Sequence, residues 1–222
     1  YDTAGQAVNL VYSGATVGWT PASDIVSAFE PVAPTIQRAI FAFGYTSSNV
    51  SMSNLVSSSG VVGSDVTGVG TARHYLAAVS YGGDKAIFGY GENGSGNVSM
   101  TNLVNNSGVV AADVSGVGTA RTGLAAASYG GDKAIFGYGQ IDGGAKSSLT
   151  NLVGNTGTVA SDVSGVGTAR AYLAAASYGG DKAIFGYGET GSYVSMTNLV
   201  NNSGVVAADV TGVGTARRLL AA

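Results

Sequence analysis

Apolar and polar residues alternate along short segments of this chain, and the segments recur at a nearly constant spacing. In one of them Ala134, Phe136 and Tyr138 fall on one side and Ile135 on the other, which is the period of two that a β-strand requires. Glycine pairs and groups of Asn, Ser and Gly separate the segments and indicate turns. The pattern therefore predicts an all-β chain of short antiparallel strands.

The segments belong to a repeat of about 48 residues. Its clearest mark is Gly-Thr-Ala-Arg, whose arginines are 48, 49 and 47 residues apart, at Arg73, Arg121, Arg170 and Arg217. Four strands are expected in each unit; in the second full unit they are 124–129, 133–138, 148–153 and 158–163. Four short antiparallel strands in each repeat of this length are typical of a β-propeller blade.

Residues 1–36 do not match the repeat. Two short strands are expected at 7–12 and 16–19, with a helical turn near 24–29 and a stiff link at Pro31 and Pro34. These residues are predicted to form an N-terminal docking or leader segment, followed by a propeller over residues 37–222.

The two ends of the repeat region complement each other. The first unit contains the Ala39–Phe41 strand and the two strands after it, but it lacks the alanine-rich first strand, which the C-terminal residues 217–222 resemble. Pairing of these ends predicts a closed four-bladed propeller without an open sheet edge, whose alanine-rich strands lie near the crowded axis. The alternative is a fragment with further repeats beyond Ala222.

Composition narrows the classes of function. The 222 residues are 45 % hydrophobic and 10 % charged, the net charge is −3, and cysteine is absent. A sparse charge without a basic stripe argues against nucleic acid as a partner, and glycine, serine and asparagine interrupt every apolar stretch, so no membrane insertion is expected. The lack of cysteine excludes disulfides and thiolate metal sites. The composition favours an extracellular or particle-surface protein.

Catalytic chemistry has little support. The strings Gly89–Gly94 and Gly186–Gly191 match Gly-x-Gly-x-x-Gly, but that fingerprint needs a strand that enters a helix, and here polar residues and another strand follow. His74 is the only histidine and has no copy in the other units, which argues against a symmetric metal site. No nucleophile, base or metal cluster recurs outside turns, so a protein without enzymatic activity, cofactor or metal is expected.

A second set of recurring residues is assigned a structural role. Each motif arginine follows an aspartate by eight residues, which is close enough for pairing within or between blades. We expect these pairs to brace the repeats; they comprise Arg73, Arg121, Arg170 and Arg217 with Asp65, Asp113, Asp162 and Asp209.

The units differ mainly in two places, the loop after Gly-Tyr-Gly and the two residues after each motif arginine. Because the first strand starts at the arginine and the antiparallel second strand ends at Gly-Tyr-Gly, both sets should lie at the same end of every blade. Variation at one end indicates a binding surface, with drift in unconstrained loops as the alternative. Tyrosines there could stack on sugars. The candidate ligand or partner residues are His74, Tyr75, Asn93, Asn97, Asp142, Tyr172, Glu189 and Tyr193.

The repeat resembles known propeller repeats. Arg121, the small apolar strand after it, the Gly130-Gly131 turn and the sequence Ala-Ile-Phe-Gly-Tyr-Gly139 resemble the kelch repeat, over residues 37–222. The chain departs from kelch in having Gly-Tyr-Gly for Gly-Gly and no tryptophan in the fourth strand. The stretch from Val66 to Asn93 also resembles the repeat of chromosome-condensation-regulator propellers. Either resemblance implies a propeller, and the choice between them stays open.

The amino-acid sequence of the repeat unit is also similar to repeats in virion structural and tail-fibre proteins of marine bacteriophages. It comprises Asp-Lys-Ala-Ile-Phe-Gly-Tyr-Gly, Val-Ser-Met-Thr-Asn-Leu-Val and Gly-Val-Gly-Thr-Ala-Arg. This similarity implies a structural or host-recognition protein of the virion, in contact with a host surface glycan or other virion proteins, with residues 1–36 as a docking or oligomerisation segment. A kelch-like adaptor for protein partners and a secreted lectin-like propeller are the alternatives.

Overall fold

The computed structural model describes residues 10–12, 19–21 and 39–222. The chain divides into two compact units, residues 1–37 and 38–222, one residue after the expected boundary. In the first unit β1 (Leu10–Tyr12) pairs antiparallel with β2 (Trp19–Pro21), so the second strand comes later than expected. The helical turn expected at 24–29 and the proline link lie outside the described residues.

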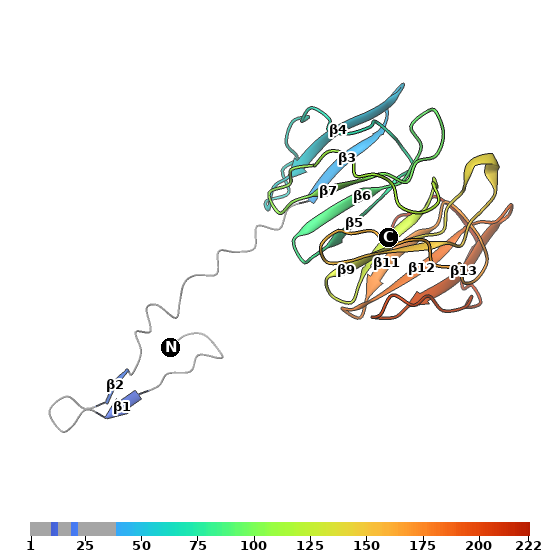
Figure 1. Cartoon of the computed structure of the whole chain (residues 1–222). Helices are drawn as coiled ribbons and strands as arrows, with labels where there is room; N and C mark the ends of the chain where they lie inside the picture. The colour runs from blue at the N-terminus through green and yellow to red at the C-terminus, as the bar shows by residue number, and fades with distance from the viewer. Residues whose placement is uncertain (1–9, 13–18, 22–38) are drawn as a thin grey trace. The chain divides into compact units, whose positions relative to one another are not determined.

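The second unit contains four antiparallel sheets in chain order (Figure 1). The first sheet is two-stranded and the other three are three-stranded, which confirms the all-β prediction. A single turn of 3-10 helix, Asp142–Gly144, is the one helical segment among the described residues. The strands are β3 (Ala39–Tyr45) and β4 (Asn49–Val56) in the first sheet; β5 (Ala77–Tyr81), β6 (Lys85–Gly89) and β7 (Thr101–Val104) in the second; β8 (Ala125–Tyr129), β9 (Lys133–Gly137) and β10 (Thr150–Val153) in the third; and β11 (Ala174–Tyr178), β12 (Lys182–Glu189) and β13 (Tyr193–Val200) in the fourth.

The turn between the first two strands of a three-stranded sheet depends on glycine. In the second sheet Tyr81 pairs with Lys85, so the chain reverses over residues 82–84. Gly82 and Gly83 have φ of 61° and 81°, in the left-handed region that residues with a side chain rarely adopt. The Gly-Gly turn predicted from the sequence is therefore present, with a conformational reason for both glycines.

The expected fourth strand is only partly formed. In the second sheet this segment makes two isolated bridges, Val110 to Val104 and Val114 to Thr101. Between the two bridges the segment advances four residues, from Val110 to Val114, whereas β7 advances three, from Thr101 to Val104. The segment therefore bulges between the bridges and does not form a regular strand. Asp113 lies in this bulge, where its carboxylate accepts a hydrogen bond from Asn102 Nδ2 at 2.9 Å.

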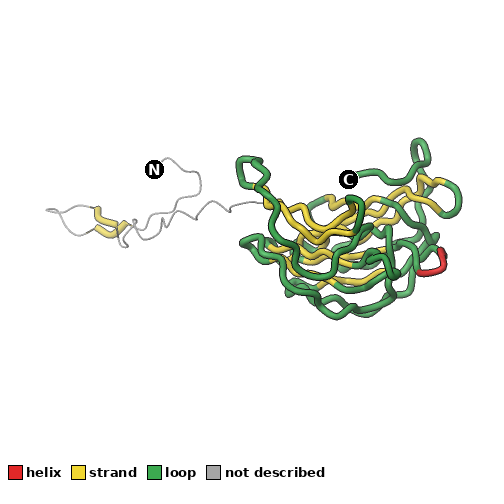
Figure 2. Tube along the Cα trace, turned by 90° about the horizontal axis from the view of Figure 1, so that it is seen from above, coloured by secondary structure: helices red, strands yellow, loops and turns green. Residues whose placement is uncertain are grey.

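The hydrophobic core lies between successive sheets. Phe136 of the third sheet packs on Gly89 of the second, where a Cβ would come within 2.8 Å of the ring. Phe185 of the fourth sheet packs in the same way on Gly137 of the third. The alanine-rich strands β5, β8 and β11 contact one another in sequence order. Figure 2 shows the strands gathered together in the unit, with loops at its periphery. Because Phe136 and Phe185 each pack on a glycine of the preceding sheet, successive sheets stack face to face.

Closure of the ring through the C-terminus is not observed, and the strand predicted at residues 217–222 is not formed. Among the described residues, no pairing joins this segment to β3. Instead Arg217 O accepts a hydrogen bond from Gly188 N (3.0 Å), as Arg73 O accepts one from Gly44 N (2.9 Å). The segment therefore docks on the fourth sheet as the start of another repeat. The first strands of the three-stranded sheets begin four residues after Arg73, Arg121 and Arg170, so residues 217–220 correspond to the connection before a strand and not to the strand itself.

Within the described part of the chain, no helix has the length and apolar character needed to cross a membrane.

Candidate binding site

In each three-stranded sheet the two variable positions are paired with each other. His74 N donates to Glu92 O (3.0 Å) and Glu92 N to His74 O (2.9 Å). Thr122 and Gln140 form the same pair in the third sheet, and Ala171 and Glu189 form it in the fourth. The residues after the motif arginine and those after Gly-Tyr-Gly thus lie at the same end of each three-stranded sheet, as predicted.

The second residue after each arginine also connects successive sheets. Gly123 N donates to Tyr75 O (3.0 Å), Tyr172 N to Gly123 O (2.7 Å), and Leu219 N to Tyr172 O (2.9 Å). All four residues have positive φ, between 51° and 60°. This line of hydrogen bonds brings variable residues that are about 48 positions apart in the sequence into contact.

The glycine in this line lets two tyrosines meet. A Cβ at Gly123 would lie 2.8 Å from Tyr172 Cε1, which no ordinary contact allows. Without that atom the rings of Tyr75 and Tyr172 approach edge to face, with centroids 5.9 Å apart. The aromatic groups of the second and fourth sheets therefore belong to one surface.

Across the first and second sheets the surface continues as a row of rings. The centroids of Tyr45 and His74 are 5.3 Å apart, and those of His74 and Tyr75 are 4.4 Å apart. Tyr45 and Tyr75 are 62 % and 50 % exposed. They border an open depression of about 650 Å³, which is lined by Tyr45, Asn49, His74, Tyr75, Glu92 and Gly94.

On the fourth sheet the surface combines rings with charges. Lys146 Nζ and the Arg218 guanidinium lie 5.4 and 5.5 Å from the centre of the Tyr172 ring. Arg218 also lies 5.4 Å from the centre of the Tyr193 ring, which is 56 % exposed. Glu189 joins the two cations, since it forms ion pairs with Lys146 (3.6 Å) and with Arg218. Hydrogen-bonding groups of both charges therefore surround the tyrosines.

Two pKa shifts reflect this environment. Burial raises the pKa of the Tyr172 hydroxyl, and the neighbouring Tyr75 and Glu189 raise it further. The hydrogen bond that Arg218 donates to Glu189 raises the pKa of the Arg218 guanidinium. Tyr172 therefore keeps its proton and Arg218 its charge at neutral pH, so both can donate hydrogen bonds to a ligand.

Five of the eight predicted ligand residues come together here, namely His74, Tyr75, Tyr172, Glu189 and Tyr193. Asn97 and Asp142 form a separate pair, in which Asn97 N donates to Asp142 Oδ1 (3.0 Å) and links the second and third sheets. Asn93 Oδ1 accepts a hydrogen bond from Ser95 N within its own turn. We call Tyr45, His74, Tyr75, Lys146, Tyr172, Glu189, Tyr193 and Arg218 the loop surface.

Tyr45, Lys146 and Arg218 were not among the predicted ligand residues. All three nevertheless lie in the variable segments. Tyr45 begins the loop after Ala42-Phe43-Gly44, Lys146 ends the loop after Gly137-Tyr138-Gly139, and Arg218 directly follows a motif arginine. The signal was therefore present in the sequence. What the sequence lacked was the lateral order of the sheets, which places Lys146 and Arg218 over the same ring.

Three of the motif arginines, Arg73, Arg121 and Arg170, are buried between sheets rather than at the loop surface. Arg73 is fully buried; Nε donates to Tyr90 O (2.9 Å), and a terminal nitrogen donates to Asn102 Oδ1 (2.7 Å). Its guanidinium stacks 4.2 Å from the ring centre of Phe43 in the preceding sheet. Its carboxylate partner is Asp113 at 3.8 Å and not Asp65, because the arginine packs into the sheet that follows it.

Burial shifts the pKa values of this cluster. It lowers the pKa of Arg73 to about 10, against the attraction of Asp113, and raises the pKa of Tyr90 to about 12. Burial alone would raise the pKa of Asp113, but hydrogen bonds from Thr71 and Asn102 outweigh it and lower that pKa. At neutral pH Arg73 and Asp113 are thus ionised and Tyr90 keeps its proton, and hydrogen bonds hold the cluster together.

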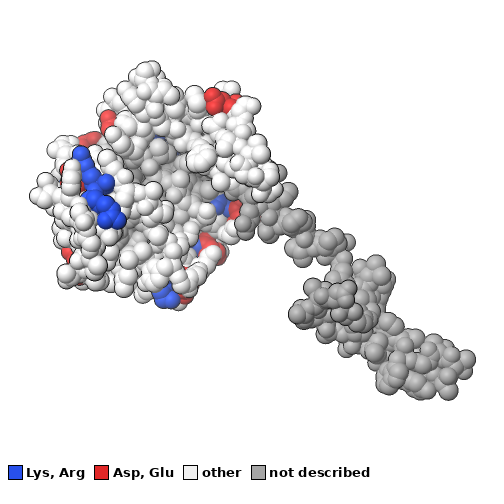
Figure 3. Space-filling model, turned by 180° about the vertical axis from the view of Figure 1, so that it is seen from behind, with Lys and Arg blue, Asp and Glu red and all other residues white. Residues whose placement is uncertain are grey.

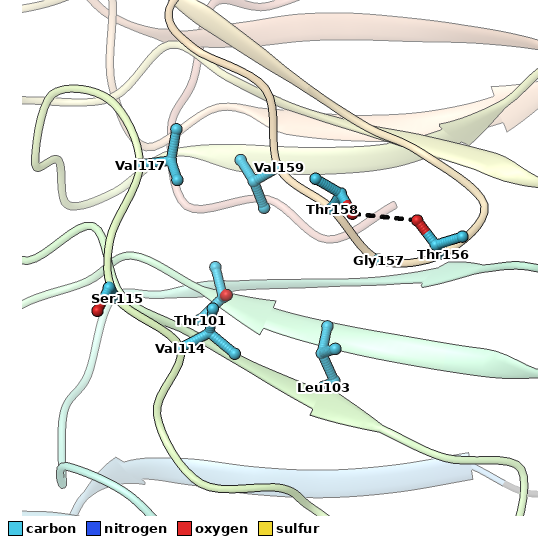
Figure 4. Close-up of a pocket in the computed structure, with 9 residues that line it drawn as sticks. All are labelled: Thr101, Leu103, Val114, Ser115, Val117, Thr156, Gly157, Thr158 and Val159. Carbon is cyan, nitrogen blue, oxygen red and sulfur yellow. Dashed lines mark hydrogen bonds between the residues drawn. The ribbon is translucent and has the colours of Figure 1, made fainter.

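A second hollow lies between the second and third sheets and is apolar (Figure 4). It measures about 200 Å³ and is lined by Thr101, Leu103, Val114, Ser115, Val117 and residues 156–159. It is smaller than the roughly 300 Å³ typical of small-molecule sites, and none of its lining residues is titratable. We assign it to the packing between sheets.

Charged groups are sparse outside these clusters. Figure 3 shows them in small groups on an otherwise uncharged face. In the described ranges, no three His, Cys, Asp or Glu side chains are placed to hold a metal ion.

No protein-family model matches this chain, and no curated protein matches it at the significance required.

Proposed function

We propose that the protein is a non-catalytic binding protein of a virus particle and that its loop surface binds a carbohydrate of the host cell. One observation carries the proposal, which is that Tyr45, Tyr75 and Tyr193 keep half or more of their area exposed at a single surface that also holds Tyr172 and His74. Exposed large aromatic rings that gather at one place commonly mark a binding site.

The chemistry of the loop surface fits a sugar. A tyrosine ring offers a flat apolar face for the C–H side of a sugar ring and a hydroxyl at its edge. Lys146, Glu189 and Arg218 lie around the Tyr172 ring and supply donors and acceptors for sugar hydroxyls. The depression of about 650 Å³ at Tyr45 and Tyr75 has the volume of a small-molecule site.

The location on a virion rests on the resemblance of the repeat to virion and tail-fibre repeats, and a docking role for residues 1–36 stays a prediction. Stacked antiparallel sheets with adjacent alanine-rich strands are compatible with a propeller. Closure of these sheets into a four-bladed ring also stays a prediction.

A glycan array with the full chain tests the binding. We expect retention of at least one class of glycan, and a loss of at least tenfold in affinity when Tyr172 and Tyr193 are both replaced by alanine. Tyr178→Ala is the matched control, because Tyr178 is a 40 % exposed tyrosine at the other end of the fourth sheet. The wild type and the variants are compared at concentrations where all of them have the same molecular mass in solution, so that a change in association is not taken for a change in binding. If no glycan binds and a protein partner does, the carbohydrate proposal is wrong and the result supports the alternative of an adaptor for protein partners.

A further inference from the structure

The contact between successive sheets is built in the same way each time. The motif arginine stacks on an aromatic ring of the preceding sheet, with Arg73 over Phe43 (4.2 Å), Arg121 over Tyr90 (4.8 Å) and Arg170 over Tyr138 (4.2 Å). We call this repeated arrangement the inter-sheet interface. The preceding side is the face of the earlier sheet, which carries the ring with the arginine stacked on it. The following side is the face of the later sheet, whose asparagine and aspartate bind the arginine and the threonine before it.

The following side holds an asparagine and an aspartate. Asp113 accepts hydrogen bonds from Thr71 N (2.9 Å) and Thr71 Oγ1 (2.7 Å), and Asn102 Oδ1 accepts one from Arg73 (2.7 Å). Thr119 with Asp162, and Thr168 with Asp209, repeat the contact in the next two interfaces. The arginine and threonine that precede a sheet are thus held by that sheet.

A phenylalanine and a turn complete the interface. The phenylalanine of the following sheet covers a small residue of the preceding one, which leaves Phe88 and Phe136 only 5 % and 0 % exposed. The turn at Gly157 covers Tyr81, and the turn at Gly204 covers Tyr129. Both tyrosines are 3 % exposed.

The fourth sheet carries a preceding side that nothing in the described chain covers. Arg217 stacks 4.2 Å from the ring centre of Tyr187 and donates to Thr215 O (3.0 Å), as the other motif arginines do. Nevertheless Arg217 is exposed, whereas Arg73, Arg121 and Arg170 are fully buried. Tyr178, the counterpart of Tyr81 and Tyr129, is 40 % exposed.

The first sheet carries the missing following side. Asn54 Nδ2 donates to Asp65 Oδ1 (2.8 Å), which matches the 2.9 Å from Asn102 to Asp113, but this pair is exposed. Phe41, the counterpart of Phe88 and Phe136, is 63 % exposed. A Cβ at Gly60, the counterpart of Gly157, would meet nothing within 4 Å.

We propose that the first sheet of one chain packs on the fourth sheet of a second copy, so that the protein associates head to tail. The two exposed surfaces are the two halves of an interface that the structure already forms three times between its own sheets. Thr215 and Arg217 of one copy would bind Asp65 and Asn54 of the other, and Phe41 would cover Gly186.

The occupant follows from the arrangement of the sheets. The first and fourth sheets lie at opposite ends of the stack, with the second and third between them (Figure 1). Each exposed half therefore faces away from its own stack. A second copy can cover it with the complementary half, whose residues match those of the three interfaces within the chain. An interface between two different surfaces of one protein is heterologous, and it yields rings where the rotation closes and filaments where it does not.

Sedimentation velocity of the full chain over a range of concentrations tests the association. We expect the mass to rise with concentration above the 21.9 kDa of one chain. Phe41→Glu places a carboxylate in the following side, and Arg217→Glu places one opposite Asp65, so each variant should stay monomeric. Val109→Glu is the matched control, because Val109 is 60 % exposed. Its counterparts Val61 (65 %) and Val205 (61 %) are exposed to a similar degree, so this position lies outside the inter-sheet interface.

Mixing the two variants separates this interface from unspecific adhesion. Phe41→Glu keeps an intact preceding side and Arg217→Glu an intact following side, so the mixture should form a dimer with one copy of each and nothing larger. Far-UV circular dichroism and thermal melting verify that both variants are folded. Phe41→Ser and Gly186→Val form a second pair should either variant fail to fold.

Two results would overturn the proposal. If the wild-type chain stays monomeric at every concentration, the exposed halves are filled within the chain, by ring closure or by residues 1–37. If the wild-type chain associates but neither variant changes its mass and the mixture forms no mixed dimer, then copies meet through another surface.

Discussion

Single residues with unusual backbone geometry shape the loop surface. Tyr75, Tyr172 and Leu219 adopt φ between 51° and 57°, which costs a residue with a side chain about 1 kcal/mol or more. The hydrogen bonds between successive sheets hold this conformation, since each of these residues donates to or accepts from the next one in the line. Position 123 has the same φ but carries glycine, which leaves room for the Tyr172 ring.

Replacing Gly123 by alanine should therefore cost more than the backbone strain alone. Gly131→Ala is the control, because Gly131 also has positive φ but a Cβ there would meet nothing within 4 Å. We expect both variants to lose about 1 kcal/mol of unfolding free energy from the left-handed backbone. Only Gly123→Ala should lose more and weaken glycan binding, because it displaces Tyr172. Urea denaturation and binding titration measure the two effects, and equal losses in both variants would show that the ring contact is unimportant.

The aspartates between sheets predict a loss of stability in acid. Burial opposes ionisation of Asp113, Asp162 and Asp209, but hydrogen bonds from threonine and asparagine lower each pKa below its ordinary value of 3.8. A carboxyl whose pKa is lower in the folded state stabilises the fold above its unfolded pKa, and this contribution disappears as the pH falls through the folded pKa. The free energy of unfolding should therefore decrease steeply below about pH 4.

Asp162→Asn isolates this contribution. It removes the charge that accepts bonds from Thr119 and Asn151, so we expect a loss of about 2 kcal/mol at pH 7 and a shallower dependence on pH below 4. Unfolding in urea at several pH values gives both quantities. An unchanged acid slope in the variant would mean that other carboxyls control acid unfolding.

The partner of each arginine could not be read from spacing. An aspartate eight residues before the arginine is near in sequence, so a pair between Asp65 and Arg73 was a reasonable expectation. The strand after the arginine, however, belongs to the next sheet, and the side chain is buried in that sheet beside Asp113. Sequence distance identified the residue types, whereas the order of packing determined the pairs.

At the scale of elements, the strands that alternate and the turns with two glycines were predictable. Their signals are local, because a period of two and a left-handed turn each depend on neighbouring residues. The fourth strand was not predictable in the same way, since its bulge is stabilised by the contact of Asp113 with Asn102 and with Thr71 across the interface. The C-terminal strand was predicted from Arg217 onward, whereas the observed first strands begin four residues after the motif arginine, because the residues between connect one sheet to the next.

The packing of phenylalanine on glycine gives a prediction for the second strand. Alanine at Gly137 would place Cβ 2.7 Å from the Phe185 ring, whereas alanine at the equivalent Gly186 would meet only Thr197 Cγ2 at 3.3 Å. We expect Gly137→Ala to lower the free energy of unfolding by about 2 kcal/mol through overpacking, and Gly186→Ala to change it by less than about 1 kcal/mol. Chemical denaturation at low protein concentration measures both. Equal effects would contradict the face-to-face stacking of sheets.

At the scale of the whole molecule, the described repeat region is a stack in which each sheet contacts its neighbours in sequence order. The stability of such an array is roughly the sum of what each unit contributes and what each interface contributes. The repeat period and the complementary ends were visible in the sequence. The sequence did not show whether the ends meet within one chain or between two chains. This depends on the rotation from one sheet to the next, which no residue pattern specifies.

Head-to-tail association predicts that thermal stability depends on protein concentration. A partner that binds only the folded state stabilises it by mass action, so the melting temperature of the wild-type chain should rise as its concentration rises. Phe41→Glu should melt at one temperature regardless of concentration, because Phe41 is 63 % exposed within one chain and its loss removes only the contact with a second copy. Calorimetry at several concentrations measures this. If both proteins melt independently of concentration and Phe41→Glu melts at a much lower temperature, Phe41 is buried within a single chain and the ends close on themselves.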